Sequence, residues 1–166
     1  MTKLDQYDWG YSRLGISNAS TSGVRTPLIL SDMIKDTIKD KVFCDCGASE
    51  GDFAVCCKRY ASKVIAIDYD EDKAEICRMK GVEGIHGNLL TMDIPDADVY
   101  YIWIGRNSLA VYKRIPSNKV VIFGNQIAEV KEQIERLPHI VCNVFQYVRD
   151  TIPMTFHWYI IKKPLA

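Results

Sequence analysis

The sequence has no excess of either charge and no long apolar run. Its 166 residues include 21 Lys and Arg and 21 Asp and Glu. This balance gives the chain no overall attraction to nucleic acid or to anionic membranes, so we do not expect strong duplex binding. The longest apolar runs, residues 99–104 and 120–123, are too short to cross a bilayer, and residues 1–6 carry no apolar signal segment. We therefore expect a cytoplasmic protein with no membrane partner.

The six cysteines form no Cys-x-x-Cys pair and have no nearby histidine at the spacing of metal ligands. They are Cys44, Cys46, Cys56, Cys57, Cys77 and Cys142. Cys44 and Cys46 fall in a predicted strand, and positions 56, 57 and 77 fall in predicted helices, where a free thiol behaves as a small apolar side chain. We expect buried, reduced cysteines and no metal site, which also fits an intracellular compartment.

The chain contains no internal repeat and no low-complexity linker, which predicts a single domain over residues 1–166. Residues 1–23 differ from the rest, because they are rich in Gly, Ser, Asn and aromatic residues and have no sustained period. We interpret them as a flexible arm or lid, with a disordered tail as the alternative. As a lid, this arm would close Tyr7, Trp9 and Tyr11 over a substrate.

Strands alternate with helices along most of the chain. The expected strands are residues 42–46, 64–67, 84–86, 99–104 and 119–123, and the expected helices are residues 27–38, 50–61, 71–80, 109–115 and 126–137. Residues 140–148 and 155–163 form two further strands with no helix between them, so they should pair antiparallel. The pattern predicts an α/β fold: a Rossmann-like, doubly wound, mostly parallel seven-stranded sheet with an antiparallel C-terminal hairpin strand.

The loop after the first strand is not a dinucleotide fingerprint. Ser49 stands where G-x-G-x-x-G has its middle glycine, and Asp45 would repel a pyrophosphate. An acid at that place instead suits a ligand with an ammonium group. Asp68, at the end of the second strand, is positioned to accept hydrogen bonds from both hydroxyls of a ribose. A ribose joined to a cationic amino-acid tail describes S-adenosylmethionine.

Four segments together resemble the class I, seven-strand methyltransferases. They are residues 45–51 (DCGASEG), 66–70 (AIDYD), 87–90 (GNLL) and 97–102 (ADVYYI). The resemblance covers roughly residues 24–163, and it is nearest to the small lysine methyltransferases of archaea and mitochondria. In those enzymes a Thr-Pro helix start, here Thr26 and Pro27, likewise precedes the glycine loop.

The resemblance implies a set of cofactor-binding residues. Those expected to hold S-adenosylmethionine are Thr26, Asp45, Gly47, Ser49, Gly51, Asp68, Tyr69, Asn88 and Leu89. Asp45 and Gly47 would hold the methionine end and Asp68 the ribose, whereas Tyr69 would lie against the adenine. Asn88 and Leu89 would read the adenine edge, although the family usually has Asp where this chain has Asn88. An amide can donate or accept, so the contact can survive the change.

The catalytic residues are less well marked. Residues 102–107 (IWIGRN), at the tip of the fourth strand, contain no acid and no known methylase signature. The candidates are Trp103 as a pocket wall, Arg106 as an anion-binding group, and Tyr11 from the arm. The alternatives are a core aromatic at Trp103 and a solvated arginine at Arg106. A protein lysine amine is the first candidate for the methyl acceptor. A small-molecule methyltransferase and a non-catalytic S-adenosylmethionine-binding subunit stay open.

Overall fold

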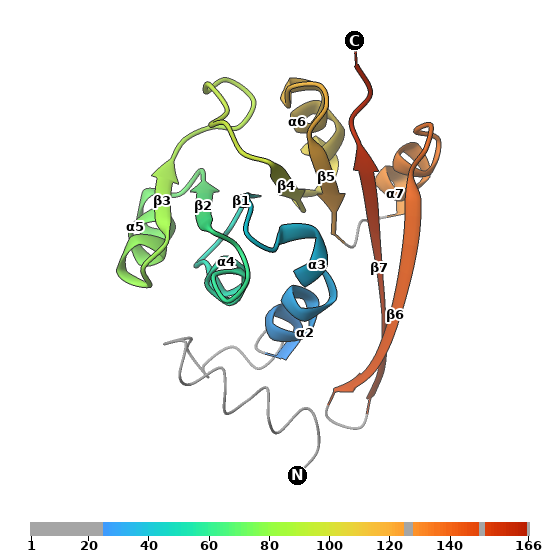
Figure 1. The fold of residues 1–166 in the computed structure, drawn as a ribbon, viewed down its shortest axis with the longest axis horizontal. Coiled ribbons are helices and arrows are strands. Elements are labelled where there is room, and N and C mark those ends of the chain that lie inside the picture. The colour runs from blue at the N-terminus through green and yellow to red at the C-terminus, as the bar shows by residue number, and fades with distance from the viewer. Residues whose placement is uncertain (1–24, 125–127, 150–151, 166) are drawn as a thin grey trace.

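The structure is a computed structural model that describes residues 25–124, 128–149 and 152–165. Seven strands form one sheet in the order β3-β2-β1-β4-β5-β7-β6 (Figure 1). The strands are β1 (Val42–Cys46), β2 (Lys63–Asp68), β3 (Glu83–His86), β4 (Val99–Ile102), β5 (Val120–Phe123), β6 (Val141–Arg149) and β7 (Ile152–Lys162). Strands β1 to β5 run parallel, whereas β7 pairs antiparallel with both β5 and β6. The predicted sheet is confirmed, including its antiparallel C-terminal hairpin.

Helices cover both faces of the sheet. They are α2 (Arg25–Met33), α3 (Lys35–Ile38), α4 (Asp52–Cys57), α5 (Glu71–Met79), α6 (Ser108–Arg114) and α7 (Ala128–Glu135), with a 3₁₀ turn η1 (Gly105–Asn107). Figure 1 shows α2, α3 and α4 grouped on one side of the sheet and α6 on the other. None of the helices in the described ranges has the length and apolar character that a bilayer crossing requires.

Two apolar clusters, one on each face, hold these layers together. The first packs α2 to α5 against residues such as Phe43 and Val99, and the second packs α6 and α7 against residues such as Tyr100 and Phe123. Alternate residues of β1, β2, β4, β5 and β7 enter alternate clusters, as a sheet with both faces covered requires. The central strands are therefore buried on both faces, and their polar residues stand out as exceptions.

Local sequence signals predicted the ends of most helices and strands to within a few residues of their observed positions. Asp70 caps α5 as expected, because its side chain accepts a hydrogen bond of 2.9 Å from the N–H of Asp72. The predicted first helix is divided at Ile34 into α2 and α3, and α2 begins at Arg25, so Thr26 lies inside the first turn and is not the N-cap. The predicted helix 50–61 is shorter, since α4 spans Asp52–Cys57.

All six cysteines are free thiols. Five are buried, and the sulfurs of Cys44 and Cys46 lie 4.0 Å apart on one face of β1. Cys142 is the correction to the predicted pattern, because it is exposed on the edge strand β6. Among the described residues no group of His, Cys, Asp and Glu is arranged to hold a metal ion.

Candidate functional site

The order of strands reverses between β1 and β4. The chain passes outward from β1 through β2 to β3, and then returns to β4 on the other side of β1. In open α/β sheets a ligand binds in the crevice outside the carboxyl ends of the strands at such a reversal. The predicted site residues Asp45, Gly47 and Ser49 follow or end β1, and Asp68 ends β2. The fold thus brings them to one edge of the sheet.

The turn after β1 depends on unusual backbone conformations. Gly47 has φ +82°, and a Cβ there would overlap Cγ2 of Ile104, so glycine is required at this position. The N–H groups of Gly47 and Ala48 both donate to the carbonyl of Ile67, at 2.9 Å each. Ser49 is also left-handed, with φ +54°. This explains why a glycine commonly stands there in the motif that the sequence resembles.

Gly51 completes the turn with φ +84°, packed against the sulfur of Cys77 in α5. The Cys77 thiol donates to the carbonyl of Ser49 at 3.3 Å. Burial raises the pKa of this thiol to about 11, so it stays protonated at neutral pH. The turn is therefore held from β2 on one side and from α5 on the other.

Asp68 ties the end of β2 to this turn. Its Oδ2 accepts a hydrogen bond of 2.8 Å from the N–H of Ser49, and its Oδ1 accepts one of 2.9 Å from the N–H of Asp70. A carboxylate has about four lone-pair sites, so each oxygen can accept a further hydrogen bond. Asp68 is only half-buried, and its orientation is set by two backbone groups. It can receive two hydroxyl groups of a ligand without moving.

Asp45 is the second carboxyl group at this edge. Its side chain is only 4% exposed and makes no hydrogen bond within the described part of the chain. Burial, followed by the charge of Asp68, raises the pKa of Asp45 to about 7. A buried carboxylate without a partner is costly, and a cationic group on a ligand would remove that cost. The pair of acids disfavours phosphate groups for the same electrostatic reason.

The predicted adenine-side residues follow β2 and β3. Tyr69 is 75% exposed directly after Asp68, and the side-chain oxygen of Asn88 accepts from the N–H of Leu90 at 2.9 Å. The NH₂ group of Asn88 is then the part of the amide left to meet a ligand. The side chain of Leu89 is buried in the core, and its carbonyl accepts from Arg114. Only the backbone N–H of Leu89 can therefore face a ligand.

The candidates after β4 lie outside the core. Strand β4 ends at Ile102, two residues earlier than predicted, so Trp103 stands in the loop and is 45% exposed. The alternative of a core aromatic at Trp103 is thus wrong. Arg106 is exposed in η1. The third candidate is Tyr11, which lies outside the described residues together with the whole arm of residues 1–23. The side chain of Thr26, a predicted cofactor-binding residue, is not described either.

Two buried polar residues on the same face of the sheet as Asp45 escaped the sequence analysis. Tyr101 is 4% exposed and Trp158 is 8% exposed, and neither the Tyr101 hydroxyl nor Trp158 Nε1 has a hydrogen-bond partner in the described ranges. Tyr101 is the direct partner of Asp45 in the β1–β4 pair, so the two side chains share a face. The period-two pattern of β4 would have identified Tyr101 only if the register with β1 had been known.

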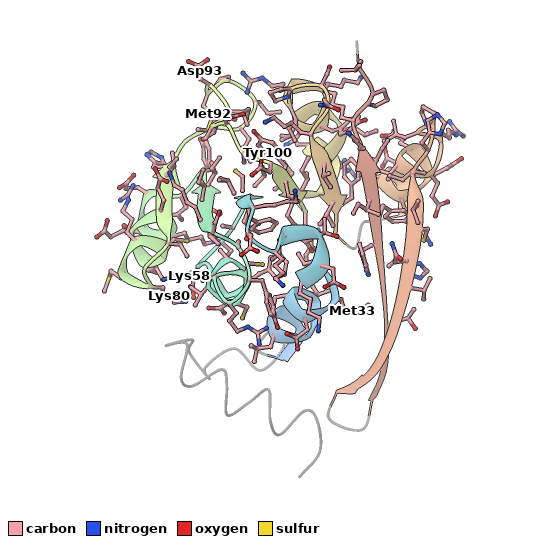
Figure 2. All side chains as sticks on the ribbon, viewed as in Figure 1. Met33, Lys58, Lys80, Met92, Asp93 and Tyr100 are labelled. Atoms are coloured by element: carbon pink, nitrogen blue, oxygen red, sulfur yellow. The ribbon has the colours of Figure 1, made fainter. Side chains whose placement is uncertain are left out.

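A cavity of about 260 Å³ lies at the opposite end of the strands. Its lining comes from the end of α4, the start of β2 and the residues after α5, including Lys58, Lys63 and Glu83. Figure 2 shows Lys58 and Lys80 on this α4–α5 side of the molecule. Lys58 donates to the carbonyl of Gly81 at 2.8 Å, so it joins two loops. This cavity is separate from the carboxyl ends of β1 and β2, where Asp45 and Asp68 lie.

No family model and no curated protein matches the sequence. Solved structures do match. An O-methyltransferase from Bacillus cereus in complex with SAH aligns with TM-score 0.61 and 14% identity over 96% of this chain and 90% of its own. A ribosomal protein L11 methylase from Lactobacillus delbrueckii aligns with TM-score 0.60 and 16% identity over 85% and 81%. An RNA methyltransferase from Salinibacter ruber in complex with S-adenosyl-L-homocysteine aligns with TM-score 0.58 and 14% identity over 84% and 91%.

The chain has the class I methyltransferase fold. This confirms the fold that the four sequence segments implied. The aligned proteins are named for different acceptors, an RNA and a ribosomal protein among them, so the methyltransferase fold does not identify the acceptor. The acceptor has to be argued from the site itself.

Proposed function

We propose that this chain binds S-adenosylmethionine at the carboxyl ends of β1 and β2 and transfers its methyl group to an acceptor. The observation that carries the proposal is the pair of carboxyl groups on either side of the glycine turn. Asp45 is buried with no partner in the described ranges, and Asp68 is oriented with acceptor sites to spare. An ammonium group and a ribose on one ligand would satisfy both.

The roles of the residues follow from their surroundings. Asp68 would accept from the two ribose hydroxyls, and Asp45 would pair with the ammonium group of the methionine end. Tyr69, which is largely exposed, would lie against the adenine ring. The free NH₂ of Asn88 and the N–H of Leu89 would donate to nitrogen atoms on the adenine edge.

When bound, the cofactor supplies a methyl group on a sulfonium, which is already activated for displacement by a nucleophile. What the chain contributes is position, because an in-line displacement depends on alignment of the reacting atoms. The rigid turn held by Ile67, Asp68 and Cys77 provides that alignment on the cofactor side. Trp103, half-exposed after β4, would form a wall of the acceptor pocket.

We propose a protein lysine amine as the acceptor. The sequence resemblance to small lysine methyltransferases supports this choice. The loop after β4, residues 103–107, carries no acidic side chain. A neutral amine already has the lone pair that attacks the methyl group, so it asks less of a general base than a hydroxyl does.

Transfer of a labelled methyl group tests this function. The full chain would be incubated with cell extract and S-adenosylmethionine labelled in its methyl group, with Asp68→Ala as the matched control. We expect label in the protein fraction, sensitive to protease, and much less label with the variant. Label in small molecules would instead indicate a small-molecule methyltransferase. Tight cofactor binding without any transfer would indicate a non-catalytic subunit.

A further inference from the structure

The hairpin of β6 and β7 is longer than the strand beside it. Strand β5 pairs with residues 159–162 of β7, whereas β6 pairs with residues 152–160. The last residue of β5, Phe123, pairs with Tyr159, so residues 152–158 lie beyond the carboxyl end of β5. Figure 1 shows this two-stranded ribbon continuing past the tip of β5. At about 3.3 Å per residue it extends for roughly 23 Å, on the side of the sheet where the proposed cofactor site lies.

The inner edge of this ribbon carries backbone groups that can receive another strand. Along a strand, the N–H and C=O groups of alternate residues point to opposite sides. The N–H of Lys163 donates to the carbonyl of Lys119 at 2.7 Å, so the odd-numbered residues of β7 face the β5 side. Beyond the end of β5 these are His157, Thr155 and Pro153, and no strand in the described ranges pairs with them on that side. We call these three residues the free edge of β7.

The proline in the free edge agrees with this direction. Proline has no N–H, so within a sheet it is confined to positions where its nitrogen faces no partner strand. Pro153 stands opposite Val148 in the hairpin, and its odd position turns its nitrogen away from β6. The β6–β7 ladder therefore loses no hydrogen bond at this position. The free edge has N–H donors at Thr155 and His157 and ends at 153 with a carbonyl alone.

The helix after β5 covers a face of the sheet. Residues 125–127, which link β5 to α7, lie outside the described ranges. In α7, Val130 and Ile134 belong to the second apolar cluster, and Glu135 accepts a hydrogen bond of 2.8 Å from the hydroxyl of Tyr159. These contacts place α7 over the side chains of β7, so α7 does not continue β5 along the free edge.

Contacts connect the glycine turn to this edge. The carbonyl oxygen of Trp103 lies 3.9 Å from the position of a Cβ built on Gly47, and its Cβ lies 3.0 Å from that of one built on Gly124. Gly124 follows the last residue of β5, so it is level with Trp158, where the pairing with β5 ends. Trp103 therefore lies between the glycine turn and the start of the free edge, and it is 45% exposed. Two strand spacings of about 4.8 Å separate the line of β5 from β1.

We propose that the acceptor protein binds as an extended segment along the free edge of β7, hydrogen-bonded to the backbone of Thr155 and His157, with its lysine beside Trp103. This inference rests on the proposed function and adds how the acceptor is held. The free edge adjoins Trp103, whereas the outer edge of the hairpin belongs to β6, so an occupant of the free edge lies where an acceptor has to lie. Strand addition draws its affinity from backbone hydrogen bonds. A lysine in an extended stretch is therefore the preferred acceptor, and one within a helix is a poor one.

Hydrogen exchange of the ligand-free chain tests whether the edge is free, and it needs no variant. The amides of Thr155 and His157 should exchange at least tenfold faster than those of Phe156 and Trp158, whose N–H groups face β6. Protection of Thr155 and His157 equal to that of Phe156 would show that the edge is already paired and would overturn the inference. Protection that appears only as the protein concentration rises would also overturn it, because a second copy would then occupy the edge.

Thr155→Pro tests whether the edge holds the acceptor. It removes one edge donor and leaves the β6–β7 ladder intact, as Pro153 already does, whereas the control Thr155→Val keeps the N–H and the branched side chain. Labelled methyl transfer to the protein fraction of a cell extract would be measured at limiting extract. We expect transfer about tenfold slower with Thr155→Pro, the worth of one or two backbone hydrogen bonds, and unchanged with Thr155→Val. Calorimetry should give both variants the wild-type affinity for S-adenosylmethionine.

Equal transfer by Thr155→Pro and the wild type would overturn this inference and leave the proposed function standing. Equal slowing by Thr155→Val would also overturn it, because the hydroxyl and not the N–H would then matter. A parallel loss of cofactor affinity would show that the proline acts through the fold and would count against the inference as well. Label in small molecules alone would remove the protein acceptor and this inference with it. No binding of S-adenosylmethionine by the wild type would overturn the proposed function itself.

Discussion

The carboxylate of Asp68 accepts a hydrogen bond of 2.8 Å from the backbone N–H of Ser49. This bond joins the end of β2 to the turn after β1, and the other carboxylate oxygen is bound by the N–H of Asp70 at 2.9 Å. The same side chain thus shapes the loop and has acceptor sites left at the carboxyl end of β2. Its replacement should affect ligand binding through both contributions.

Asp68→Ala is expected to weaken S-adenosylmethionine binding by about 2–3 kcal/mol, since hydrogen bonds to a charged group contribute about 1.5–3 kcal/mol. Asp68→Asn is expected to do similar damage. An amide has one oxygen, and its NH₂ would face the N–H of either Ser49 or Asp70. The sequence alone favours Asn as the milder change, because an amide oxygen still accepts. Calorimetry measures the affinities of both variants for S-adenosylmethionine, with circular dichroism as the control for folding. An Asn variant with wild-type affinity would refute the claim that Asp68 both shapes the loop and binds the ligand.

The affinity for S-adenosylmethionine should depend on pH through Asp45. Its pKa is raised to about 7 in the ligand-free protein, and the ammonium group requires the ionised form. Affinity should therefore be constant above about pH 7 and should fall about tenfold for each pH unit below it. Asp45→Asn should bind weakly with no such dependence. A wild-type affinity that is flat between about pH 5.5 and 8 would place the ammonium group away from Asp45.

The same carboxyl group should make the ligand-free protein less stable as pH rises. Because the folded pKa of about 7 lies above the ordinary value of 3.8, the proton is held more tightly in the folded state. That stabilisation is complete below about pH 4 and is lost as pH rises toward 7, by up to about 4 kcal/mol. Asp45→Asn should accordingly match the wild type near pH 4 and exceed its free energy of unfolding near pH 8. Urea denaturation of the variant and the wild type at both pH values measures their free energies of unfolding. If Asp45→Asn gained the same amount at both pH values, Asp45 would not be the group that titrates.

Gly47→Ala should destabilise the fold, whereas Ser49→Gly, two residues away, should not. Both positions are left-handed, which costs an L-residue about 1–2 kcal/mol. At Gly47 the added methyl would also overlap Cγ2 of Ile104, so the loss should be at least about 1–2 kcal/mol. Ile104→Leu removes that branch and should restore part of the loss in the double variant. Urea midpoints at constant slope measure these changes, and a Gly47→Ala variant of wild-type stability would contradict the geometry of the turn.

Local chemistry in the sequence was enough to predict β1 and the cap of α5. Residues 42–46 form an apolar run, and Asp70 precedes an acidic first turn, so the signals lie next to the elements that they specify. The end of β4 was not predictable in this way, because residues 99–104 are apolar throughout although the strand stops at Ile102. Where the pairing ends, and hence the exposure of Trp103, depends on the neighbouring strands.

Asp45 and Asp68 could be identified from their spacing and from the resemblance, because both end strands that the pattern predicts. Tyr101 and Trp158 could not. Their positions on one buried face follow from the β1–β4 and β5–β7 registers. Those relationships join residues more than thirty positions apart, and one sequence carries no record of them.

Binding of S-adenosylmethionine is the claim on which the proposed roles of Asp45 and Asp68 depend. Titration calorimetry of the full chain with S-adenosylmethionine, S-adenosylhomocysteine and NAD tests it most directly. We predict dissociation constants in the micromolar range or below for the first two ligands, which share the ribose and the ammonium group, and no binding of NAD. Micromolar binding of NAD with no response to the two S-adenosyl ligands would contradict the claim.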